Sequence, residues 1–113
     1  MSEGERGGLT VLDRAHLAMY SGGDAALEAE LFALLEGQIE ACTQRMAQAA
    51  PGDAQAWRDA AHTLKGAARG VGAMQLGEAC AAAETRPHDA GALEAVRTAA
   101  KAVRDAMRHA RGA

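Results

Sequence analysis

Apolar residues recur along most of the chain at steps of three and four, the spacing that puts side chains on one face of an α-helix. Four segments carry such a stripe, and turn residues separate them. The residues expected to face a core are Leu27, Leu31, Leu34, Leu35, Ile39, Cys42 and Met46; Trp57, Ala61, Leu64, Ala68 and Val71; Ala73, Leu76, Cys80 and Ala83; and Leu93, Val96, Ala100, Val103 and Met107. No segment alternates with a period of two, so no strand is predicted.

Glycine, proline and aspartate mark the ends of these segments. Asp24, Asp53 and Asp89 are expected to cap the second, third and last helices, because an aspartate side chain accepts hydrogen bonds from the free N–H groups of a first turn. The third helix follows the breaker sequence AAPGD, and the sequence RGVG ends or bends it. The last helix is expected to run to about residue 109.

A shorter helix is predicted ahead of these four, over residues 10–20, and the turn SGGD ends it. Ala15 and Met19 are expected on its inner side, together with Val11 or Leu12. The segment 1–8, MSEGERGG, is polar and rich in glycine and is expected to be a flexible tail. The chain is therefore predicted to be all-α: an antiparallel, up-down four-helix bundle over residues 9–113 with a short extra N-terminal helix.

Composition narrows the class of protein further. The chain has 113 residues and one each of Phe, Trp and Tyr, so its single core must come from closely packed helices. A net charge of -3 argues against a nucleic-acid-binding protein.

No apolar run approaches the ~20 residues that span a bilayer, and no signal peptide is evident, so a cytoplasmic protein without membrane contact is predicted. Cys42 and Cys80 are expected to be reduced core residues.

The third helix combines a buried face with a polar one of unusual composition. His62 projects about 140° from Trp57 around the helix axis, roughly opposite the core stripe. Arg58 and Arg69 share its direction, and Lys65 follows one turn later. Gly66 costs about 1 kcal/mol relative to alanine inside a helix. Because a side chain there would cover the surface beside the imidazole, the glycine is expected to keep His62 accessible to another macromolecule.

This combination suits a histidine that carries a phosphoryl group. Imidazole is a neutral nucleophile near pH 7 and can hold a group on one ring nitrogen. Neighbouring cations disfavour the imidazolium form and stabilise negative charge on the acquired group. Phosphoryl transfer depends mainly on positioning and charge stabilisation, so one exposed histidine flanked by cations suffices if the partner supplies the metal and the acidic pocket.

The stretch AHTLKGAARGVGA resembles the phosphoacceptor motif of histidine-containing phosphotransfer (HPt) domains, H-x-x-K-G followed by a small-residue GA. LDRAHLAMYSGGD and LGEACAAAE are similar to that family's leading helix and to the helix after its motif, so the resemblance covers about residues 10–107. It implies that His62 is the phosphorylated residue, Lys65 faces the phosphoryl group and Gly66 gives access. Glu84 falls where the family often has a polar residue near the site. Ala67 departs from the serine that many members have there.

The resemblance also implies a function. The chain would accept a phosphoryl group from an aspartyl phosphate on a response-regulator receiver domain, hold it on Nε2 of His62 and pass it to another receiver in a two-component phosphorelay. Arg58, Arg69 and Glu84 are the expected partner contacts. A hybrid histidine kinase is a further candidate partner, and a monomer is expected. No sequence resembles a nucleotide-binding loop, so no cofactor and no autophosphorylation from ATP are expected, and Mg²⁺ would belong to the receiver.

Two other functions compete with this one. The chain could be a helical adaptor that binds a signalling partner without covalent chemistry, which would need no Gly66 beside His62 and would survive His62→Gln. A metal-binding bundle ranks last, because it would project carboxylates and histidines inward and the predicted interior is apolar. His16, His88 and His109 have no mutual spacing typical of metal ligands.

Overall fold

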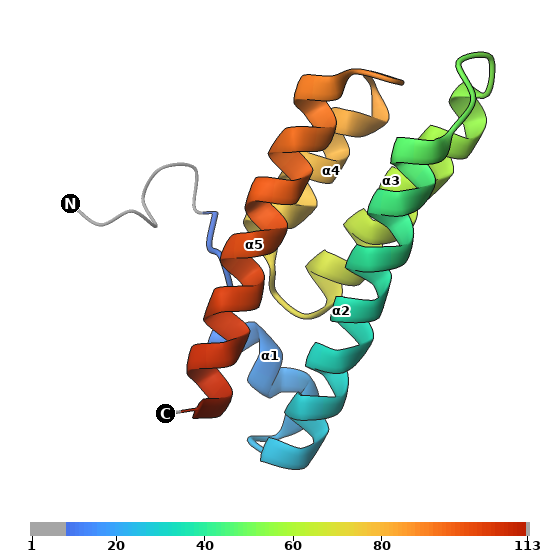
Figure 1. Ribbon diagram of the computed structural model, residues 1–113. Coiled ribbons are helices and arrows are strands. Elements are labelled where there is room, and N and C mark those ends of the chain that lie inside the picture. The colour runs from blue at the N-terminus through green and yellow to red at the C-terminus, as the bar shows by residue number, and fades with distance from the viewer. Residues whose placement is uncertain (1–8, 113) are drawn as a thin grey trace.

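The computed structural model describes residues 9–112 and contains five α-helices and no strand among them (Figure 1). The helices are α1 (Arg14–Ser21), α2 (Ala25–Gln48), α3 (Ala54–Gly70), α4 (Met74–Glu84) and α5 (Ala90–Gly112). The predicted all-α class is confirmed. The expected tail, residues 1–8, lies outside the described residues. No helix of the described range is both long and apolar enough to cross a bilayer.

The four longer helices enclose one core. α3 packs against α2 and α4, and α5 packs against the same two helices from the other side. The small α1 contacts α2 at one end of the molecule, near the start of α2 (Figure 1). Every predicted inward residue of α3, α4 and α5 is buried. The core is made largely of alanine, leucine, valine and sulfur-containing side chains, which allow the helices to approach closely.

The three predicted caps are confirmed. The Asp24 carboxylate accepts from the backbone N–H groups of Ala26 and Leu27, and Asp53 accepts from Ala56. Asp89 Oδ1 accepts from the N–H of Ala92 at 3.0 Å, at the start of α5. Each cap satisfies donors that the first turn of its helix leaves free, so local sequence sets where these helices begin.

The leading helix differs from its prediction. It begins at Arg14 rather than Thr10, because Asp13 caps it by accepting from the N–H of His16. This start makes Leu17 the residue that enters the core, whereas Met19 is 79% exposed. The expectation that Ala15 and Met19 face inward was wrong. Residues 9–12 are not helical.

The prediction for one residue of the α2 stripe was also wrong. Leu34 is 68% exposed, and Phe32 is buried in the core. The two positions lie about 200° apart around a helix, so they cannot share a face. Leu35, Ile39, Cys42 and Met46 are buried as predicted. The sequence LFALL offers apolar residues on all sides of the helix, so spacing alone does not select the inward face there.

The α3–α4 turn depends on a glycine. Gly72 has φ +88°, and a Cβ there would lie 2.8 Å from the Asp13 carbonyl oxygen. The Gly72 carbonyl accepts from the N–H of Asp13 at 2.9 Å, and the carbonyl of Thr10 accepts from the N–H of Gln75 at the same distance. The N-terminal segment thus holds the turn that sets how α4 returns along α3.

Candidate functional site

His62 lies in the middle of α3, on the face that points away from the core. Trp57, Ala61, Leu64 and Ala68 are buried, whereas the His62 side chain is 69% exposed. The predicted orientation of the helix is therefore confirmed. An imidazole on this face is open to a second macromolecule.

A buried hydrogen bond fixes α4 beside this face. The indole Nε1 of Trp57 donates to the carbonyl oxygen of Ala83 at 2.7 Å. Ala83 directly precedes Glu84, the last residue of α4. The contact joins the beginning of α3 to the end of α4, so the Glu84 side chain lies beside the third and fourth turns of α3, where it contacts His62 and Lys65.

Glu84 bridges the two residues that the motif singled out. Its Oε2 lies 3.0 Å from Nδ1 of His62, and its Oε1 accepts from Nζ of Lys65 at 2.6 Å. The Lys65 and Glu84 side chains are 21% and 22% exposed. The hydrogen bond from Lys65, joined by that from His62, holds the pKa of the Glu84 carboxyl below its ordinary value despite partial burial. Glu84 is accordingly ionised at neutral pH.

This carboxylate selects one tautomer of the His62 ring. An ionised carboxylate has no proton to donate, so Nδ1 must carry the hydrogen of the 3.0 Å contact. In the neutral ring the other nitrogen, Nε2, then has a free lone pair. Nε2 is the nitrogen farther from the backbone, and the side chain that carries it is 69% exposed. Of the two ring nitrogens, Nε2 is therefore the one whose lone pair is available.

The space beside the ring is open at Gly66. A Cβ built there would meet nothing within 4 Å, and the residue is exposed. The glycine is therefore not required for close helix packing. Its position one turn after His62 agrees with the expected role of leaving the surface beside the imidazole uncovered.

The two arginines assigned to partner binding are separate from this cluster. Arg58 donates to Gln55 Oε1 at 3.1 Å on α3. Arg69 reaches across to α4, where its Nη2 lies 4.0 Å from Oε1 of Glu78. Among the hydrogen bonds and ion pairs of residues 9–112, neither arginine engages His62 or Glu84.

Comparisons with known proteins identify the family of the chain. The family model described as Hpt domain matches residues 25–109, which is most of the chain. The chain belongs to the Hpt domain family. A solved structure, the histidine phosphotransferase ShpA from Caulobacter crescentus, is 37% identical and has a TM-score of 0.69. The similarity covers 88% of this chain and 89% of that one. A search of curated proteins finds no match.

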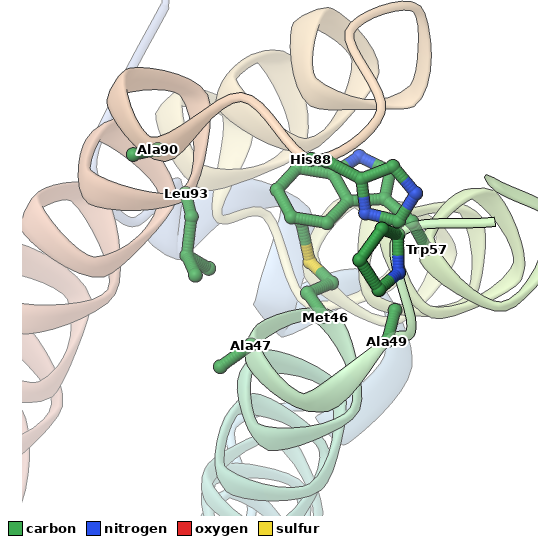
Figure 2. Close-up of a pocket in the computed structure, with 8 residues that line it drawn as sticks. Met46, Ala47, Ala49, Trp57, His88, Ala90 and Leu93 are labelled. Carbon is green, nitrogen blue, oxygen red and sulfur yellow. The ribbon is translucent and has the colours of Figure 1, made fainter. Parts of the chain in front are cut away.

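A second histidine of this Hpt chain lies at one end of the molecule. His88 is in the α4–α5 turn with φ +64°, and its ring centroid is 5.7 Å from that of Trp57. The two rings border a mainly apolar cavity of about 290 Å³ (Figure 2). The cavity is lined by Met46, Ala47, Ala49, Pro51, Trp57, His88, Ala90 and Leu93. No carboxylate belongs to this lining, unlike the surroundings of His62.

The remaining candidates for chemistry are structural. Cys42 and Cys80 are free and buried, as predicted. Burial raises the pKa of both thiols, that of Cys80 to about 12, so neither is a thiolate at neutral pH. Within residues 9–112 no three or more His, Cys, Asp or Glu side chains are grouped to hold a metal ion.

The bridging position of Glu84 was not evident from sequence. The resemblance to HPt domains pointed to a polar residue near the site, but the contact joins residues 22 positions apart. Only the packing of α4 on α3 determines which side chain of α4 faces His62. The close contact between Arg69 and Gly77 could not be predicted from the pattern of apolar residues either.

Proposed function

We propose that this Hpt protein relays phosphoryl groups between receiver-domain aspartates through a phosphohistidine at His62. One observation carries the proposal: His62 is exposed, and its Nδ1 lies 3.0 Å from the Glu84 carboxylate, which leaves Nε2 with a free lone pair. The match to the Hpt family and the likeness to a histidine phosphotransferase support a phosphorelay role. Arg58, Arg69 and Glu84 are the proposed partner contacts.

The transfer step follows from the ring geometry. The Nε2 lone pair attacks the phosphorus of an aspartyl phosphate, the Nε2–P bond forms, and the bond from phosphorus to the carboxyl oxygen breaks. The aspartate leaves as a carboxylate and takes the electron pair of that bond. The proton stays on Nδ1, and the positive charge that the ring gains lies against the Glu84 carboxylate. The reverse step delivers the group to another receiver.

Lys65 contributes a positive charge next to the His62 ring. Before transfer its ammonium group donates to Glu84 at 2.6 Å, which keeps the cation next to the ring. After transfer, the phosphoryl oxygens on His62 offer Lys65 a second set of acceptors. We therefore assign Lys65 to stabilising the phosphorylated state. Mg²⁺ and the acidic pocket belong to the receiver in this scheme, and the chain does not use ATP itself.

The proposed scaffold is the antiparallel, up-down four-helix bundle, over residues 9–113, in a cytoplasmic monomer. The closed ring of packing, with α3 and α5 each against α2 and α4, supports this arrangement. The alternating colour gradient along α2, α3, α4 and α5 in Figure 1 supports the antiparallel directions. Such a scaffold keeps His62 fixed on a rigid helix during two docking events.

The test is direct transfer of phosphate. Receiver domains phosphorylated with radiolabelled phosphate are incubated with the protein, and the product is treated with acid and with base. We expect label on the protein that acid removes and base does not, as for phosphohistidine, and no label on His62→Gln. A protein that binds receivers but never acquires label, or a His62→Gln variant labelled like wild type, would show an adaptor rather than a carrier.

A further inference from the structure

A notch in α4 accommodates an arginine of α3. Gly77 is buried, and a Cβ at this position would lie 2.8 Å from Cγ and 3.2 Å from Nε of Arg69. The side chain of Arg69 therefore lies across the bare backbone of α4. Glycine inside a helix costs about 1 kcal/mol relative to alanine, and alanine fills most small positions of α4. The space that glycine leaves is occupied by the arginine stem.

The end of the Arg69 side chain is available to a partner. The side chain is 49% exposed, and its acidic neighbour Glu78, 60% exposed, is 4.0 Å away. An exposed ion pair at this distance holds its members weakly, because water screens the charges. Contact of the stem with α4 at Gly77, rather than this pair, thus directs the guanidinium.

Arg69 also lies within reach of any protein that docks at His62. The two residues are seven positions apart, so on a helix their backbone positions differ by about 10 Å along the axis and about 20° around it. A stable protein interface covers about 800 Å² on each partner, a patch of roughly 16 Å radius. A domain that brings its phosphorylated aspartate to Nε2 therefore covers the guanidinium as well.

We propose that Arg69, placed by the Gly77 notch, is a specificity-determining residue that selects receivers with a surface carboxylate about 10 Å from their phosphorylated aspartate. The planar guanidinium can bind that carboxylate with two parallel hydrogen bonds. A receiver with a lysine or arginine at the same place is rejected by like charge. Gly77 is the positioning residue for this contact. The inference rests on the proposed function of His62.

The experiment measures the initial rate of transfer against the concentration of phosphorylated receiver. Wild type, Arg69→Ala, Arg69→Lys and Gly77→Ala are compared, with Arg97→Ala on α5 as the control that also removes one exposed positive charge. We expect Arg69→Ala to raise the half-saturating concentration about tenfold, because the variant loses one charged contact with the receiver. The maximal rate should not change. Arg69→Lys should recover part of the loss, and Gly77→Ala should move the same parameter in the same direction.

A charge exchange tests the partner's chemistry. Surface carboxylates of the receiver at about the proposed distance are changed to lysine one at a time and paired with Arg69→Glu. One of these receivers should restore the half-saturating concentration that Arg69→Glu loses. If none does, or if Arg69→Ala behaves like Arg97→Ala while wild type is labelled normally, the inference about Arg69 is wrong and the carrier function stands. If wild type takes no label, both fail.

The role of Gly77 has its own control. A methyl group at this position collides with the Arg69 stem, so Gly77→Ala can lower stability as well as docking. The double variant Gly77→Ala/Arg69→Ala removes the collision and should melt at a temperature no lower than that of Arg69→Ala alone. Equal half-saturating concentrations for Gly77→Ala and wild type would show that the notch does not position Arg69.

Discussion

His62 and His88 are both exposed histidines next to α4, and their surroundings differ in every respect that matters for reactivity. His62 lies within a regular helix with its Nδ1 against Glu84, which is shared with Lys65. His88 lies in a turn with a left-handed backbone, and its ring lies beside that of Trp57, with the two planes tilted by 53°, at the rim of an apolar cavity. Both rings are exposed, so we infer that the contact of one ring nitrogen with a carboxylate, present at His62, distinguishes the proposed phosphoacceptor.

Removal of each imidazole gives the sharpest form of this comparison. His62→Gln should abolish phosphate acceptance, because no nucleophile remains at the site. His88→Gln should accept phosphate at the wild-type rate, because His62 and its contact with Glu84 are left intact. The measurement is incorporation of radiolabel from a phosphorylated receiver. Equal losses in both variants would mean that the two regions do not differ as the geometry implies.

The next effect concerns the hydrogen bond that distinguishes the two rings. Glu84→Gln removes the negative charge that holds the proton on Nδ1 and balances the charged ring, so we expect transfer to slow about tenfold. Single-turnover kinetics measure the rate, and nitrogen NMR shifts of the imidazole report the tautomer. Glu94→Gln, on α5, is the control. An unchanged tautomer together with an unchanged rate would remove Glu84 from the mechanism.

Access to the ring is expected to have a smaller effect. Gly66→Leu should raise the half-saturating receiver concentration about fivefold, since an oversized side chain in a packed interface costs about 1 kcal/mol or more. Gly66→Ala and Gly37→Ala should each raise the free energy of unfolding by about 0.5–1 kcal/mol, because an added Cβ meets nothing within 4 Å at either position. Receiver binding that is equal for Gly66→Leu and wild type would show that the glycine does not provide access.

The smallest effect is a dependence of stability on pH. The folded protein holds the pKa of Glu84 below its ordinary value of 4.5, so the ionised carboxylate favours the folded state. This contribution is fully present above pH 4.5 and is lost as the pH falls through the lowered pKa. The free energies of unfolding of wild type and Glu84→Gln should differ by up to about 1 kcal/mol at pH 7 and converge as the pH falls below the lowered pKa of Glu84. A difference that grows at low pH would contradict the assignment.

Much of the fold could be predicted from sequence because its determinants are local. The stripe from Trp57 to Val71 and the caps at Asp24, Asp53 and Asp89 appear in the structure as expected. Prediction failed where local signals conflict. Capping by Asp13 moved the start of α1 and turned Met19 outward, and the apolar run LFALL concealed the exposed position of Leu34.

The candidate site likewise has a part that could be predicted from sequence and a part that could not. Its histidine, lysine and glycine are neighbours on one helix, so the sequence by itself determined that they share an outward face. The partner of His62 is 22 residues away, and the notch that receives Arg69 is on another helix. Only the tertiary structure decided these contacts. The physical reason is that helix periodicity sets directions within one helix, whereas the register between α3 and α4 depends on the packing around Trp57 and its hydrogen bond to Ala83.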